Sequence, residues 1–316
     1  MTRLSWRSAD LADAAGLAAL FQAVEQSAPV GLETELAEVQ ARLSSPRLDL
    51  AADTLAGVDA AGALLAYAEA AGMGIGQGQV RIRVTSAVHP ELGTDVVAST
   101  LDWLMTRSRS LLREQGADLP GVLGARCAAA DQARLTMLTE AGFEVVRWHQ
   151  DMVRSLTPPV PAAPPPGVTI VRYDPRYAEA ARITHNDAYA DDPGALLPDA
   201  ASWPQHAVGL ASFLPAASFL ALADTAGGPV VAGFLFSLDG GTGEGLLYCL
   251  GTTKPWRQRG LATAMIGHAL AAYQQAGLAM ARLEVDSTNA GALRLYSQLG
   301  FTGSDRGYAM LQAPIS

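Results

Sequence analysis

A turn rich in arginine and glycine follows an apolar run in the second half of the chain. Residues 246–250 read LLYCL, which is typical of a strand buried on both faces. The next residues read GTTKPWRQRGLATAM and lead into an amphipathic helix. Unpaired N–H groups and the dipole at a helix N-terminus attract anions, Gly260 and Ala262 let an anion approach, and Arg257 and Arg259 add charge. The pattern R-x-x-G-x-A therefore indicates a pyrophosphate cradle, although an ordinary strand-to-helix turn with solvated arginines would read the same.

A second strand and a second helix follow this turn. Residues 281–286 read ARLEVD, and residues 287–301 read STNAGALRLYSQLGF, with a helical pattern that ends at a glycine. Tyr296 on its own would be read as a core aromatic of that helix. Together, residues 246–301 resemble the GCN5-related N-acetyltransferase (GNAT) superfamily, whose motifs include the R-x-x-G-x-A loop and the N-x-x-A-x-x-x-Y-x-x-x-G-F helix.

The resemblance implies acetyl-CoA as a cosubstrate and assigns roles to matching positions. The backbone of Leu250, Gly251 and Thr252 would pair with the pantetheine arm like an added strand. The pyrophosphate would be held by the backbone of seven residues, Arg257, Gln258, Arg259, Gly260, Leu261, Ala262 and Thr263. Asn289 would contact the pantetheine region, and Tyr296 would donate a proton to the departing thiolate. A phenol suits that role because it is protonated at neutral pH.

A general base is also needed, because the attacking amine must be neutral. Glu244 precedes the apolar run and shares a face with Leu246 and Tyr248 if the strand extends that far. Many GNAT enzymes keep a carboxylate near this position. Glu284 and Asp286 on the next strand are alternatives, and a glutamate at a strand end can also be merely solvated.

The acceptor pocket of such folds would include residues 185–192, HNDAYADD, and the stretch around Trp203. Three aspartates there could favour a cationic amine or aminosugar, or could serve only as capping and turn residues. No cluster of His, Asp and Glu has metal-ligand spacing, so no metal is expected. Cys127 and Cys249 lie in different halves and are expected to be packed thiols.

A proline-rich stretch, residues 158–166, splits the chain, and its prolines forbid helix and sheet. The two halves match at an offset of 158 residues, which aligns Asp131 with Asn289 and Gly142-Phe143 with Gly300-Phe301. We therefore expect an α/β fold with mixed sheets, built as two tandem GNAT folds at residues 1–157 and 167–316. The layout resembles mycothiol synthase and related bacterial two-domain GNAT proteins.

The first copy is expected to be degenerate and non-catalytic. Its loop, residues 88–96, reads VHPELGTDV, so Asp95 stands where the key glycine would be and its charge would oppose a pyrophosphate. Leu138 replaces the tyrosine. The first half is therefore interpreted as a structural or substrate-shaping domain.

The amino-acid composition limits the kinds of partner that the protein is expected to bind. A formal charge of −9 argues against nucleic acid, and no apolar run is long enough to span a bilayer. With no signal-peptide pattern at the N-terminus, a cytoplasmic location is expected. Two covalently joined domains could imitate the dimer of single-domain relatives, which would leave the chain monomeric.

The sequence thus predicts an enzyme that transfers acetyl from acetyl-CoA to the primary amine of a small molecule. The acceptor could be an aminosugar thiol precursor, as for mycothiol synthase, or an antibiotic, an amino acid or a protein amine. The alternative is a non-catalytic acyl-CoA-binding sensor or scaffold, against which Tyr296 and Asn289 argue, because a binding module needs no proton donor.

Overall fold

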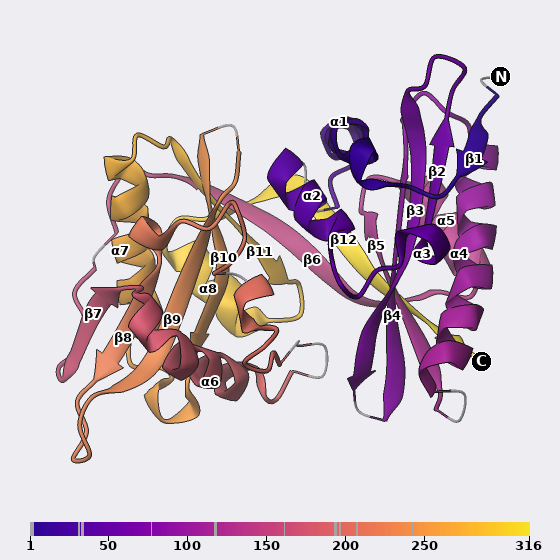
Figure 1. Ribbon diagram of the computed structural model, residues 1–316. Coiled ribbons are helices and arrows are strands. Elements are labelled where there is room, and N and C mark those ends of the chain that lie inside the picture. The colour runs from indigo at the N-terminus through magenta and orange to yellow at the C-terminus, as the bar shows by residue number, and fades with distance from the viewer. Residues whose placement is uncertain are drawn as a thin grey trace. The chain divides into compact units, whose positions relative to one another are not determined.

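The computed structural model describes residues 3–30, 32, 35–76, 78–116, 119–160, 162–192, 195, 197–206, 208–241 and 243–316 (Figure 1). These residues form two compact units. The first consists of residues 1–150, 286–288 and 306–316, and the second of residues 151–285 and 289–305. Residues 157–167 contain no helix or strand in their described part, and Pro161 of the predicted linker lies outside it.

The first unit is a mixed sheet with helices. Its strands lie in the order β1-β2-β3-β4-β5-β12. The strands are β1 (Ser5–Arg7), β2 (Thr54–Val58), β3 (Leu64–Gly76), β4 (Gln79–Val88) and β5 (Gly121–Ala128), with the end of β12 (Thr302–Ile315). The helices are α1 (Ala14–Ser27), α2 (Leu36–Leu43), α3 (Leu50–Asp53), α4 (Thr94–Gly116) and α5 (Gln132–Glu140).

The second unit has the strand order β6-β11-β10-β9-β8-β7. These strands are the end of β6 (Glu144–Ser155), then β7 (Val168–Arg172), β8 (Phe219–Ala223), β9 (Val230–Asp239), β10 (Glu244–Thr252) and β11 (Met280–Asp286). Its helices are α6 (Ala178–Tyr189), α7 (Leu261–Gln275) and α8 (Ala290–Gln298). Alternate residues of β9 join two different cores, one beneath α7 and one beneath α6, so these two helices cover opposite faces of the sheet.

The last strand of the chain completes the sheet of the first unit. Tyr308–Ile315 pair antiparallel with Gly121–Ala128, in register from Tyr308 opposite Ala128 to Ile315 opposite Gly121. Ala309, Leu311 and Ala313 are buried in the core of that unit. The C-terminal segment therefore belongs, by its hydrogen bonds and its packing, with the first half of the sequence.

The predicted repeat is visible as two matching helix ends. Both α5 and α8 end in a left-handed glycine, Gly142 with φ +92° and Gly300 with φ +83°. Phe143 N donates to Leu138 O and Phe301 N donates to Tyr296 O, each at 3.0 Å. This is the Schellman arrangement, which needs a residue free to adopt positive φ. The two repeated segments therefore end their helices with the same C-terminal motif.

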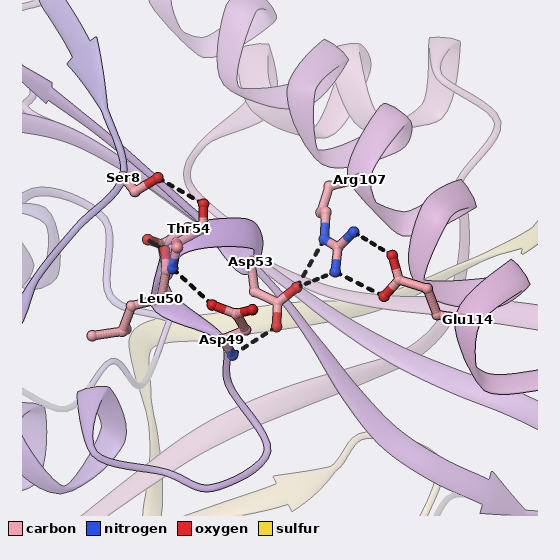
Figure 2. Close-up of polar contacts among 8 residues, drawn as sticks. Ser8, Asp49, Leu50, Asp53, Thr54, Arg107 and Glu114 are labelled. Carbon is pink, nitrogen blue, oxygen red and sulfur yellow. Dashed lines mark hydrogen bonds and ion pairs between the residues drawn. The ribbon is translucent and has the colours of Figure 1, made fainter.

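The sequence predicts hairpins over residues 48–67, with Asp53 and residues 59–62 as turn material, and over residues 219–238. The antiparallel pairs β2–β3 and β8–β9 confirm both, with one difference. The turns fall at residues 59–63 and 224–229, but Asp53, predicted as turn material, lies in α3 and is 3% exposed. Figure 2 shows why: Arg107 of α4 donates to Asp53 Oδ1 at 2.8 Å and also binds Glu114. The Thr54 hydroxyl donates to Leu50 O at 2.6 Å. The short helix is thus held by a buried ion pair that local sequence does not reveal.

Candidate active site

Strand β10 separates from β11 half-way along its length. The two pair in parallel only from Glu244 to Leu247, whereas β9 stays paired with β10 as far as Thr252. The register with β9 shifts between Leu247 and Cys249, which makes Tyr248 a bulge. Among the described residues, the backbone beyond the bulge therefore has no strand partner on the β11 side. An extended ligand could pair with this free edge as an added strand.

The loop after β10 leads to an uncapped helix N-terminus. Gly260 is the N-cap of α7 with φ +86°, and as a glycine it has no side chain that could cap the first turn of this helix. Gln258 also has a positive φ, +59°. Residues 257–260, which lead into the first turn of α7, are exposed, so an anion can approach this loop from solvent. An added Cβ on Gly260 would meet nothing within 4 Å, so glycine is required here by its backbone angle and not by crowding.

The basic side chains of this loop have specific partners. Arg257 donates to Ala188 O at 3.0 Å and to Thr252 O at 3.3 Å, which ties the end of α6 to the end of β10. Lys254 Nζ lies 2.9 Å from Asp191 Oδ1, and this ion pair lowers the pKa of Asp191. Arg259 lies over the Trp256 ring at 4.9 Å. Asp191 thus balances the positive charge of Lys254 in this loop.

Tyr296 is half-buried on α8, where its ring packs edge-on against Phe301 at 6.0 Å. Burial, with a smaller contribution from the Cys249 thiol on β10, raises the pKa of Tyr296 to about 12. The phenol is therefore protonated at neutral pH, as a proton donor must be. Asn289 is the N-cap of α8, and its side-chain oxygen accepts from Ala292 N at 3.0 Å. Its observed task is helix capping.

Glu244 is the first residue of β10 and is half-buried, so the strand does extend to it. Its charge helps to raise the pKa of Arg282 on the neighbouring strand, although burial opposes that rise and Asp151 contributes more. The two other candidate bases are engaged in ion pairs: Glu284 with Arg282 at 3.0 Å, and Asp286 with Arg147 at 3.1 Å.

The region predicted to receive the acceptor contains a packed cluster of aromatic side chains. Trp203 is 4% exposed and packs in one cluster with Phe234, Phe236 and the α6 residue Tyr189. Gly251 is needed where α6 meets β10, because an added Cβ would lie 2.6 Å from the Phe234 ring and 2.8 Å from Ala188. The Tyr189 hydroxyl donates to Leu250 O at 3.0 Å, so one carbonyl of the free strand edge is held by a side chain.

Comparison with known proteins shows which folds this chain resembles. Residues 170–301 match the model of the Acetyltransferase (GNAT) family. A solved GCN5-related N-acetyltransferase from Sphaerobacter thermophilus superposes with a TM-score of 0.75 at 22% identity, over 98% of this chain and 95% of that one. A tandem GNAT protein from the clavulanic acid biosynthesis pathway superposes with a TM-score of 0.70 at 14% identity, over 99% and 98%. The chain has a tandem GNAT fold.

Among curated proteins, a mycothiol acetyltransferase of Thermobispora bispora is 34% identical over 180 residues. The match covers 51% of this chain and 57% of the relative, so the chain spans little more than half of that relative's length. Within the described residues, no helix is both long and apolar enough to cross a membrane.

The first GNAT unit has the same strand separation, but a side chain fills it. Its β4 and β5 pair in parallel only from Val80 to Arg83. Three residues beyond this last pair, Ser86 O accepts a hydrogen bond from Arg134 Nη2 at 2.5 Å. Arg134 follows the N-cap Asp131 by three residues, as Ala292 follows Asn289. The position that is alanine in the second unit is thus an arginine bound to the strand edge in the first. Sequence reasoning missed this residue, although the repeat alignment contains it.

The second GNAT unit also brings together three residues that sequence spacing did not group. One ring nitrogen each of His185 and His206 and the Cys249 Sγ lie within 4.8 Å of one another. The expectation of no metal considered only the spacing of His, Asp and Glu along the sequence, and this group contains a cysteine and is formed by the fold. His206 was overlooked because it lies 21 residues from His185 and joins it only through the fold.

Proposed function

We propose that this protein is an N-acetyltransferase that moves acetyl from acetyl-CoA to the primary amine of a small molecule, and that the second unit carries the reaction. The observation that carries the proposal is the free edge of β10 beyond Leu247, which leads directly to the uncapped N-terminus of α7. A pantetheine arm needs the first feature and a pyrophosphate needs the second. The family match over residues 170–301 covers both.

Each chemical requirement of acyl transfer has a candidate group. The amine attacks the thioester carbonyl, and backbone N–H groups just beyond the Tyr248 bulge would stabilise the developing oxyanion. As the C–S bond breaks, Tyr296 would protonate the leaving thiolate. Glu244 would take the proton from the amine through water, because the other two strand carboxylates are held in ion pairs.

The roles of the cofactor loop follow from its conformation. The backbone from Arg257 to Thr263 would hold the pyrophosphate, with the two left-handed residues, Gln258 and Gly260, turning successive N–H groups toward it. Leu250, Gly251 and Thr252 would pair with the pantetheine arm. Asn289 would support this arm indirectly, by capping the helix that carries Tyr296.

The acceptor is proposed to be a small amine that enters beside α6, where aromatic residues supply apolar walls. An aminosugar thiol is the first acceptor to test, because a relative that is 34% identical is a mycothiol acetyltransferase. The first unit is proposed to be non-catalytic, since Arg134 occupies the strand edge that a pantetheine arm would need.

The experiment that tests this function is a calorimetric titration of acetyl-CoA into the wild type and into Gly260→Asp. The variant places a carboxylate and a strained residue at the cradle, since φ +86° is unfavourable for any L side chain. Gly277→Asp is the matched control, because Gly277 has φ +80°, equally open surroundings and a place at the other end of α7.

We expect one binding site in the wild type and in the control, and none in Gly260→Asp. Binding that survives in Gly260→Asp would show that the cradle has been assigned wrongly. Release of free CoA in the presence of a panel of primary amines then separates an enzyme from an acyl-CoA-binding sensor. A sensor would bind acetyl-CoA and turn over none of the amines.

A further inference from the structure

His185 of α6 and His206 are arranged so that one ring nitrogen of His185 carries no proton. Asn186 Nδ2 donates to Pro198 O at 3.0 Å, which turns Asn186 Oδ1 toward His185. This oxygen lies 3.0 Å from His185 Nδ1 and can only accept, so Nδ1 must carry the proton. His185 Nε2 then has a free lone pair. It lies 2.9 Å from His206 Nε2.

Cys249 completes the group from the β10 side. Its Sγ lies 3.5 Å from the Tyr189 hydroxyl, whose own proton goes to Leu250 O. The tyrosine oxygen therefore accepts from the thiol. Among the described residues, no donor is then left for the lone pairs of the Cys249 sulfur. His206 and Cys249 are half-buried, whereas His185 is 2% exposed.

We propose that His185, His206 and Cys249 bind a divalent transition-metal ion of the zinc class. Two imidazoles and a thiolate are ligands that zinc prefers, with bonds of about 2.0–2.1 Å to nitrogen and about 2.3 Å to sulfur. Tetrahedral coordination then separates the two nitrogens by about 3.3 Å and each nitrogen from sulfur by about 3.6 Å. The observed separations are 2.9 Å between the Nε2 atoms and at most 4.8 Å within the group, so they would change by up to about 1.2 Å on metal binding.

The residues around the two histidines hold the rings in the way that neighbours of metal-bound histidines do in other proteins. The hydrogen bond from His185 Nδ1–H to Asn186 fixes both the tautomer and the ring orientation, as partners of metal-bound histidines do. Trp203 stacks on His206 with ring centroids 5.8 Å apart and an interplanar angle of 23°, which holds the second ring in place. Three protein ligands leave a fourth position for water or for a donor atom of the acceptor.

Binding has a defined proton balance. Zinc-class ions bind neutral imidazoles and a thiolate, so a set of two histidines and one cysteine releases the thiol proton when the metal binds. The His206 proton moves from Nε2 to Nδ1 and stays on the ring.

The test is a titration of the chelator-treated full-length protein with Co²⁺, a spectroscopic substitute for zinc. We expect one ion per chain, a near-ultraviolet thiolate-to-cobalt charge-transfer band, displacement by Zn²⁺, and release of about one proton in calorimetry at pH 7. Absence of a saturable band in the wild type would overturn the proposal without any variant. This readout is independent of acyl transfer, so it stands apart from the outcome with acetyl-CoA.

Variants then test the assignment. Cys249→Ser should abolish the charge-transfer band, and Asn186→Ala should weaken binding by about 10–100-fold through loss of the supporting hydrogen bond. Cys127→Ser is the matched control, because Cys127 is the other free cysteine and lies buried in the first unit. Near-ultraviolet circular dichroism checks that each variant is folded. A band that persists in Cys249→Ser, or disappears in Cys127→Ser, would show that the histidine pair is only a packed hydrogen bond.

Discussion

Arg134 suggests a direct way to close the proposed cofactor channel: place the same side chain at the matching position of the second unit. In the first unit this guanidinium bonds Ser86 O at 2.5 Å, three residues beyond the last parallel pair of β4. In β10 the corresponding free edge begins after Leu247, the last such pair. Ala292→Arg should therefore put a guanidinium against the strand edge that the pantetheine arm would use.

The size of the effect follows from the contacts that are lost. If two or three backbone hydrogen bonds to the arm are replaced, at about 1 kcal/mol each, affinity for acetyl-CoA falls by about 2–3 kcal/mol. This corresponds to a dissociation constant raised by about 30–150-fold, before any steric exclusion is added. ADP should still bind as it does to the wild type, because it carries the pyrophosphate without the pantetheine arm.

Calorimetric titration measures both ligands on the same protein. Ser297→Arg is the matched control, since it adds the same side chain to an exposed position of α8. Wild-type affinity for acetyl-CoA in a folded Ala292→Arg variant would refute the equivalence of the two strand edges. Parallel loss of ADP binding would show general damage to the site instead.

Two further predictions concern Tyr296 and the core of the first unit. Tyr296→Phe should keep acetyl-CoA affinity and lower turnover by about 10²-fold. Burial raises the pKa of Tyr296 to about 12, so the wild type should lose no activity through this group between pH 7 and 10. A pH–rate profile measures this. Glu69→Gln should lower the free energy of unfolding at pH 7 by about 3 kcal/mol, because buried Glu69 lies 2.7 Å from the buried Arg42 guanidinium. Burial alone would raise the pKa of Glu69, but Arg42 and Arg83 outweigh it and hold this pKa below its usual value of 4.5. The stability contributed by the ion pair is therefore present above pH 4.5 and is lost as the pH falls below it. Urea unfolding of both proteins at pH 7 and at pH 3 checks this, and a difference that grows in acid would contradict it.

Local patterns were enough to predict the elements around the candidate site. The apolar run, the glycine with positive φ and the polar N-cap act within a few residues of one another, so β10, α7 and α8 could be placed from sequence. Features that depend on tertiary contacts could not. Asp53 looked like a turn residue because its partner, Arg107, is distant in sequence.

The same limit applies to the site. Gly260 and Tyr296 belong to one continuous motif, whereas His185, His206 and Cys249 meet only once α6 packs against β10. Arg134 could have been identified from the sequence, because the repeat that aligns Asp131 with Asn289 also aligns Arg134 with Ala292. Its meaning depended on the separation of β4 from β5, which no local pattern encodes.

The pairing of β12 with β5 has a consequence for synthesis on the ribosome. Residues 121–128 are made about 180 residues before their partners, residues 308–315. The nascent first half therefore has an unpaired strand edge while the whole second unit is synthesised, and such edges promote association between chains. A stop codon before residue 308 would remove the partner strand, so the stability of the N-terminal half depends on a segment encoded far downstream of it.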